Sequence, residues 1–228
     1  MDCYSLDTNL VIPLINSHDH NHGLAISILK RELRNGVICT SVIEETKIVF
    51  RDRLNKIIGN CLSKLIRLKT IKEKIERDQF ILNVFNDLSQ NDPYLADFYK
   101  LIYQQITQFI AIKPIEYLPG FLSTLIEHYT RIIIPTIKGK GFGIITWDHN
   151  DKVAFNKIFD IKKVISSIRF KDEYDKSIFH ELAAIASIEY TIEFYTHDFE
   201  FSKKALIAIK KLINNINYAP STLSFIYV

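Results

Sequence analysis

The segment Tyr4-Ser5-Leu6-Asp7-Thr8-Asn9 decides how this chain is expected to begin its fold. Residues 3–6 form a short apolar-rich run, which is typical of a buried strand, and Asp7 follows at its carboxyl end. Apolar residues then recur with helical spacing from Leu10 to Ile15, and Asp7 or Thr8 is suited to cap that helix. The sequence therefore predicts a strand that delivers a carboxylate to the edge of a sheet.

The same alternation of strand and helix signals continues along the chain. Further β-rich runs occur at residues 37–40, 144–146, 193–196 and 224–228, and helical patterns separate them. Such alternation indicates an α/β fold with a mainly parallel sheet. The pattern from about residue 52 to 140 is helical throughout. We therefore expect one domain with a core of about residues 1–50 and 141–228, interrupted by a large helical insertion of about 52–140.

Composition narrows the class of protein without naming its partner. The chain has 228 residues, 24% of them charged, and a formal net charge of +3, which is too small to indicate nucleic-acid binding on its own. Cys3, Cys39 and Cys61 are widely spaced and have no metal-ligand pattern, as expected for buried thiols in a reducing compartment. Asp2 and Asp7 interrupt the apolar start, so no signal peptide is expected, and no apolar run approaches the roughly 20 residues of a membrane span. These features predict a cytoplasmic protein with no membrane partner.

Carboxylates occupy the positions where an α/β fold places its working residues. Some follow strands directly and others lie near helix starts: Asp7 and Asp198, then Glu44, Glu45, Asp172 and Asp175. Because the carboxyl ends of parallel strands share one edge of a sheet, we expect these acids to lie close together. Clustered carboxylates repel one another unless a cation neutralises them, and hard oxygen ligands favour Mg²⁺ or Mn²⁺. Such a site can activate water for attack on a phosphodiester.

Four segments, in order, resemble the four motifs of the PIN-domain family. They are Asp7-Thr8-Asn9, Thr40 to Glu45, Asp172 to Ile178, and Thr196-His197-Asp198-Phe199-Glu200-Phe201. The resemblance covers about residues 1–50 and 165–210, and the compact members of the family lack the long middle block. It implies a three-layer PIN-like fold and an endoribonuclease that depends on Mg²⁺ or Mn²⁺. It also implies single-stranded or structured RNA as substrate, and a homodimer. An antitoxin or regulatory protein is a further implied partner, if the chain is the toxin of a toxin–antitoxin pair rather than an RNA-processing enzyme.

Within the motifs we take Asp7, Glu45, Asp175 and Asp198 as the catalytic acids and metal ligands. Glu45 is preferred to Glu44 because helical spacing places it on the apolar face of its helix. Asp175 suits the first turn of a helix, but Glu181 remains an alternative because its distance before Thr196 is more usual for the family. The simpler interpretation of Asp7 and Asp198 is that each only caps a helix or turn.

Two polar segments outside the motifs invite a function. The cluster His18-Asp19-His20-Asn21-His22 can be interpreted as a zinc site, but we favour a solvated link between two helices, which can help to bind phosphate or a base near Asp7. Residues 51–74 are rich in Lys and Arg, as a helix that recruits RNA or DNA would be, or as the solvated face of a core helix would be. Both alternatives stay open for this basic segment.

Two further segments are weaker candidates. Lys138-Gly139-Lys140 can contact phosphate, although it lacks a P-loop pattern, and Asp148 in Thr146-Trp147-Asp148 partly repeats the fourth motif. If the acids were only structural, the chain would instead be a non-catalytic PIN-like module that binds RNA or acts as a scaffold through residues 51–74.

Overall fold

A parallel sheet lies at the centre of the computed structural model, which describes residues 1–228 except 146–151, 187–189, 217 and 220–221. Its strands are β1 (Asp2–Leu6), β2 (Asn35–Cys39), β3 (Phe142–Ile145), β4 (Thr191–Thr196) and β5 (Leu223–Tyr227). They form a five-stranded sheet in the order β3-β2-β1-β4-β5, and every neighbouring pair is parallel. The predicted α/β class and mainly parallel sheet are confirmed.

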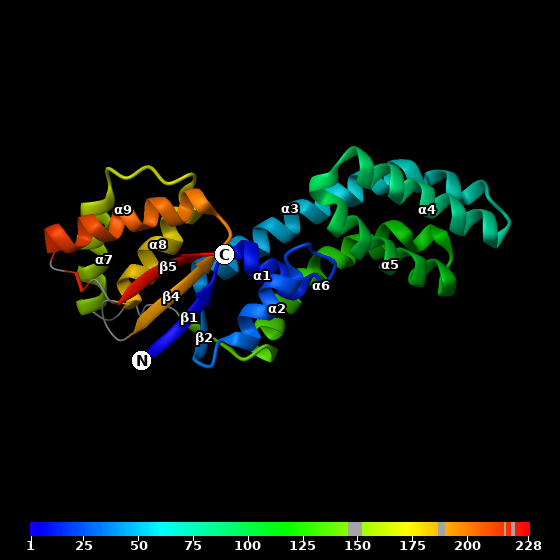
Figure 1. Ribbon diagram of the computed structural model, residues 1–228. Helices are drawn as coiled ribbons and strands as arrows, with labels where there is room; N and C mark the ends of the chain where they lie inside the picture. The colour runs from blue at the N-terminus through cyan, green and yellow to red at the C-terminus, as the bar shows by residue number, and fades with distance from the viewer. Residues whose placement is uncertain (146–151, 187–189, 217, 220–221) are drawn as a thin grey trace.

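Helices cover both sides of the sheet, with α7, α8 and α9 on one side and α1, α2 and part of α6 on the other (Figure 1). The helices are α1 (Thr8–Ile15), α2 (His22–Arg31), α3 (Thr40–Leu65), α4 (Lys74–Asn91), α5 (Ala96–Ile112), α6 (Leu118–Gly139), α7 (Lys152–Ile165), α8 (Glu173–Ala186) and α9 (Phe199–Ile216). Short 3-10 helices occupy Ile66–Thr70, Pro93–Leu95 and Ile115–Tyr117. No described helix has both the length and the apolar character needed to cross a membrane.

The strands form where they do because both of their faces are covered. Leu6, Ile38 and Phe194 are fully buried, so the inner strands are runs of apolar residues rather than alternating ones. Close approach of β2 and β3 also requires Gly36, where an added Cβ would lie 2.6 Å from the ring of Phe142. This packing holds the carboxyl ends of the strands in one row.

Most of the expected insertion, residues 52–140, is a helical arm that extends away from the sheet, and the end of α6 returns to it (Figure 1). Its first helix, α3, starts at the end of β2 and continues for 26 residues without a break. The predicted boundary near residue 52 therefore falls inside a continuous helix that runs from the core into the arm. Phe50 packs against Phe98 and Tyr129, with ring centroids 5.1 and 6.3 Å away, which ties α3 to α5 and α6.

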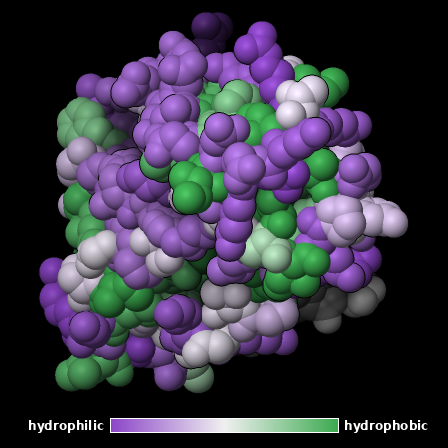
Figure 2. Space-filling model, turned by 90° about the vertical axis from the view of Figure 1, so that its right-hand side faces the viewer, coloured by the Kyte–Doolittle hydropathy of each residue, from purple (hydrophilic) through white to green (hydrophobic). Residues whose placement is uncertain are grey.

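The distal part of the arm buries its apolar residues between its own helices. Ile81 and Phe85 of α4 are buried, as are Tyr99 and Ile102 of α5. Seen from the end of the arm, the surface is mostly hydrophilic with hydrophobic side chains scattered between (Figure 2). The arm therefore has a small core of its own.

The basic segment 51–74 is not one helix, which corrects the single helix that both of its interpretations assumed. Helix α3 ends at Leu65, a 3-10 turn follows, and α4 begins at Lys74. No Gly or Pro marks the turn. The turn is held instead by the buried side chain of Leu68 and by the Arg77 side chain, which donates to the Ile71 carbonyl. Lys56 and Lys64 are also neutralised in part, by Asp92 at 2.6 Å and Asp87 at 3.2 Å.

Candidate metal centre

The predicted acids come from four elements that meet at the carboxyl edge of the sheet. Asp7 follows β1 and Asp198 follows β4, and these two strands are neighbours. Strand order reverses at this point, because β2 and β3 lie on one side of β1 while β4 and β5 lie on the other. In parallel α/β sheets, ligands bind in the crevice at such a reversal. Glu45 is contributed by α3 and Asp175 by α8.

Hydrogen bonds fix the carboxylate of Asp7 and join it to the start of the fourth motif. Its Oδ1 accepts from the Thr8 N–H at 2.8 Å, and its Oδ2 accepts from Asn9 Nδ2 at 2.9 Å and from Thr196 Oγ1 at 2.6 Å. The Thr196 hydroxyl also accepts from the Asp198 N–H at 2.9 Å. One buried hydroxyl therefore connects the first and fourth predicted acids.

Glu45 and Asp175 face the same place from the two neighbouring helices. Glu45 accepts a hydrogen bond from the Thr8 hydroxyl, whereas Glu44 points to solvent and pairs with Lys47 at 2.6 Å. Asp175 differs from the other acids because its Oδ2 is buried and has no hydrogen-bond partner. A buried carboxylate oxygen without a partner is costly, and such an oxygen is suited to receive a cation.

The carboxylates raise one another's pKa values. Burial raises the pKa of Asp7 to about 6, and the charge of Asp198 adds to this. Burial likewise raises the pKa of Glu45 to about 7, with Asp7 contributing. For Asp175, burial comes first and then repulsion by Asp172 and by all three of the other predicted acids, which together raise its pKa to about 7. The four carboxylates therefore lie near enough for their charges to act on one another.

Positive charge near the cluster comes from Lys171. Its Nζ lies 3.7 Å from Asp198 Oδ2, and its charge opposes the rise in the pKa of Glu45. Its side chain is 70% exposed, so it neutralises the cluster only weakly.

Helix capping, the simpler interpretation of the acids, is correct for two of them. Asp7 caps α1 through the Thr8 N–H, and Asp198 Oδ1 accepts from the Phe201 N–H of α9 at 2.9 Å. Capping does not prevent metal binding, because a carboxylate has about four lone-pair positions. Asp172, which the third motif also contains, caps α8 by accepting from the Tyr174 and Asp175 N–H groups.

Glu181, the alternative third acid, has a different task. Its two oxygens accept from the Thr40 N–H at 3.2 Å and the Ser41 N–H at 2.7 Å, so it caps α3 across the fold. Ser41 itself does not cap this helix, which begins one residue earlier at Thr40. The carboxylate of Glu181 is thus committed to two backbone donors.

The donor set suits a hard divalent cation held partly through water. All four groups are carboxylates, the ligands that Mg²⁺ and Mn²⁺ prefer, and Asp175 Oδ2 has a free position. Among the described residues, three ligand atoms come within 4.8 Å of one another only at Asp19, His20 and Asp97, so no three of the four acids approach one another that closely. Mg²⁺ commonly keeps several of its waters and takes one or two carboxylates directly, which matches this wider spacing.

The histidine-rich link contacts the arm, and two of its three histidines have different partners. His20 Nδ1 lies 3.2 Å from Asp97 Oδ2, while His22 Nδ1 lies 2.6 Å from the Pro13 carbonyl oxygen, so these two rings have separate partners. Burial acts to raise the pKa of Asp97, but hydrogen bonds from His20 and Lys100 outweigh it and lower that pKa. Sequence reasoning missed Asp97, because it lies 77 residues from His20 and carries no local motif.

One of the weaker candidates lies away from this centre, and the other falls outside the residues that the structure describes. Lys138 and Lys140 precede β3, so they lie at the amino edge of the sheet, opposite the acids. Asp148 falls outside the described residues.

Comparison with known proteins does not identify a family for this chain. No protein-family model matches the chain, no curated protein matches it, and no solved structure matches it. The resemblance to PIN domains therefore rests on the four motifs.

Proposed function

We propose that this protein is an endoribonuclease that depends on Mg²⁺ or Mn²⁺ and uses Asp7, Glu45, Asp175 and Asp198 as its acidic centre. The observation that carries the proposal is Asp175 Oδ2, a buried carboxylate oxygen without a partner in the field of the other carboxylates. A purely structural cluster would leave this cost uncompensated. RNA as substrate class comes from the resemblance of the four motifs to PIN domains.

Each acid has a distinct part in holding the cation. Asp7 is the best-ordered ligand, because three hydrogen bonds fix its carboxylate before any cation arrives. Thr196 acts as a positioning residue for Asp7, and Thr8 does so for Glu45. Asp175 supplies the oxygen that gains most from a positive charge.

A bound Mg²⁺ or Mn²⁺ ion supplies an activated water and positive charge at the scissile phosphate. The chain itself contributes orientation and charge around that phosphate. The Lys171 ammonium lies beside Asp198 and is mostly exposed, so it can contact a phosphate of the substrate. Its removal should weaken substrate binding more than it weakens metal binding.

Cleavage of a mixed RNA pool in Mn²⁺ tests the proposal. We expect Asp7→Asn and Asp175→Asn to lose more than about 100-fold in rate, because even a residue that only orients a metal ligand contributes 10–100-fold. Glu44→Gln is the matched control, since Glu44 is an exposed acid on the same helix as Glu45. EDTA should abolish cleavage by the wild type. Equal cleavage by wild type and Asp7→Asn would assign the activity to another site or to a contaminant and would refute the proposal.

If none of these proteins cleaves RNA, the chain is the non-catalytic alternative, a PIN-like module that binds RNA or acts as a scaffold. Binding of labelled RNA by wild type and Asp7→Asn is measured in the same buffers. It shows whether the protein binds RNA without cleaving it or does not bind RNA at all.

A further inference from the structure

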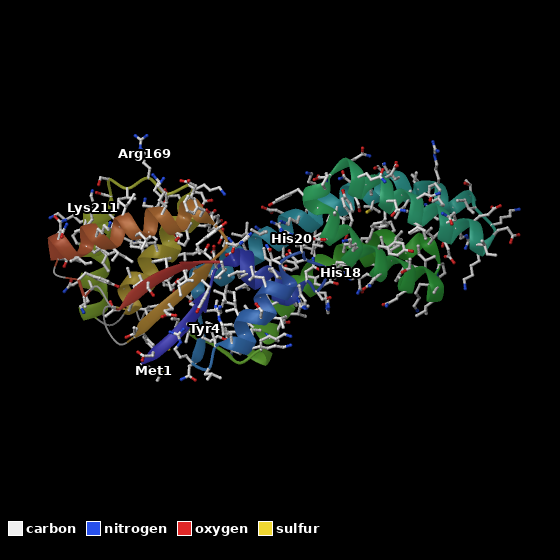
Figure 3. All side chains as sticks on the ribbon, viewed as in Figure 1. Met1, Tyr4, His18, His20, Arg169 and Lys211 are labelled. Atoms are coloured by element: carbon white, nitrogen blue, oxygen red, sulfur yellow. The ribbon has the colours of Figure 1, made fainter. Side chains whose placement is uncertain are left out.

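A cavity of about 170 Å³ opens where the helical arm meets the sheet domain. Its wall includes Asn9, His20, Arg53, Tyr94, Asp97 and Phe98. These residues come from four separate stretches: the start of α1, the link before α2, α3, and the 3-10 turn Pro93–Leu95 together with the first turn of α5. Figure 3 shows His18 and His20 at this junction, between the sheet domain and the arm.

The cavity adjoins the acidic centre through a single side chain. Asn9 lines the cavity, and its Nδ2 donates to Asp7 Oδ2 at 2.9 Å, while its Oδ1 accepts from the His197 N–H at 3.2 Å. The cavity therefore lies next to the acids, with one side chain shared between them.

An aromatic ring and a fixed cation stand at the arm side of the cavity. The Arg53 guanidinium lies 4.8 Å from the ring centre of Tyr94 and 5.1 Å from that of Phe98, and its Nη2 donates to the Tyr94 hydroxyl at 2.7 Å. These contacts hold the guanidinium in place before any ligand binds. Tyr94 is nevertheless 72% exposed, so much of its ring is free to contact a ligand.

Two carboxylates also line the cavity. Asp97 Oδ2 accepts from the His20 N–H at 3.0 Å, and Asp19 Oδ1 accepts from the Asn21 N–H at 2.9 Å. The first bond fastens the link to the arm, and the second lies within the link, so both carboxylates are held in place. Carboxylates accept hydrogen bonds from amino groups and repel phosphate, so this part of the lining suits a base rather than a backbone.

We propose that this cavity binds one unpaired base of the RNA strand whose backbone reaches the acidic centre. The base stacks on Tyr94, Arg53 faces the adjoining phosphate, and Asp19 and Asp97 favour a base with an exocyclic amino group. Aromatic stacking with a nearby cation is the usual means of binding single strands. The proposal rests on the proposed nuclease function for the identity of the ligand, and it assigns a role to the helical arm.

Binding of a short labelled single-stranded RNA, measured by fluorescence anisotropy in EDTA, tests the cavity without cleavage. We expect Tyr94→Ala to raise the Kd roughly 5- to 100-fold, because loss of one stacked base has an effect of this size. Tyr94→Phe should bind nearly as the wild type does. Tyr117→Ala is the matched control, because Tyr117 is also exposed, at 65%, and lies in the turn between α5 and α6. Oligo-adenylate should bind more tightly than oligo-uridylate.

The outcomes separate this proposal from the nuclease assignment. Weaker binding by Tyr94→Ala supports the cavity even if no variant of the acids alters cleavage, in which case the nuclease assignment fails alone. An unchanged Kd for both Tyr94→Ala and Arg53→Ala overturns the cavity even if Asp7→Asn abolishes cleavage. Failure of the wild type to bind any single-stranded RNA also overturns it. Melting temperatures of all variants serve as the folding control, and the exposure of Tyr94 predicts little change.

Discussion

Replacing Asp175 with Asn should make the metal-free protein more stable, although the change removes a proposed metal ligand. The Asp175 carboxylate is partly buried, its Oδ2 has no partner, and Asp7, Glu45, Asp172 and Asp198 all raise its pKa. Asn has nearly the same shape and no charge. The substitution therefore removes repulsion and desolvation without removing a hydrogen bond from Oδ2.

The pKa shift sets the size of the effect. A rise from 3.8 to about 7 is roughly three pKa units, and one unit corresponds to about 1.4 kcal/mol, so a fully buried group would contribute about 4 kcal/mol at pH 8. Asp175 is only partly buried, and solvent screens its charge, which lowers the expected gain to about 1–2 kcal/mol. For a chain of this length that gain raises Tm by about 3–6 °C.

Thermal unfolding at pH 8, first in EDTA and then in excess Mn²⁺, measures both halves of the prediction. The wild type should gain about 2.7 kcal/mol at a Mn²⁺ concentration 100 times its Kd, while Asp175→Asn should gain much less. Glu44→Gln, an exposed acid outside the cluster, should match the wild type in both buffers. A lower Tm for Asp175→Asn in EDTA, or an undiminished gain with Mn²⁺, would refute the reasoning.

Three further results follow from the same geometry. The pKa values of Asp7, Glu45 and Asp175 are raised to about 6, 7 and 7, so their contribution to the stability of the metal-free protein is present near pH 4 and is lost as pH rises through about 7. Urea unfolding in EDTA across this range measures the loss, and Mn²⁺ affinity should change oppositely, falling below about pH 7 because the ligands must release protons. Thr196→Val removes the hydroxyl that donates to Asp7, which should lower the free energy of unfolding by about 1–3 kcal/mol and weaken Mn²⁺ binding in a calorimetric titration. Glu181→Ala leaves the first N–H groups of α3 without their acceptor and should lower the free energy of unfolding by about 2 kcal/mol. Its Mn²⁺ affinity should change little. Loss of the Mn²⁺ response in a folded variant would instead make Glu181 a ligand.

Local patterns in the sequence predicted the sheet and the edge at which the acids gather. Apolar runs such as residues 3–6 form strands because both faces of a parallel sheet are buried, and that signal lies entirely within a few residues. An acid directly after such a run, as at Asp7 and Asp198, must lie at the carboxyl edge of the sheet. Helical periodicity also indicated that Glu45, rather than Glu44, faces inward, and the side chains lie that way.

Other features depend on residues that are far apart in the chain, and only the tertiary structure decided them. Glu181 caps a helix that begins 141 residues earlier, so nothing near it in sequence shows which donors it serves. The turn after Leu65 contains no Gly or Pro that would mark it in the sequence. It is held by the buried side chain of Leu68. Asp97 contacts His20 only because the chain returns to the link at the start of α5.

The opening segment itself shows the same division. Its local pattern was enough to place Asp7 at the end of a buried strand and at the cap of a helix. Burial within the fold raises the pKa of Asp7, and the charge of Asp198 adds to that rise. The hydrogen bond from Thr196, a residue 189 positions away in the chain, opposes the rise. Secondary structure follows from neighbours along the chain, whereas electrostatic fields and hydrogen-bond partners depend on distance in space, which the fold alone determines.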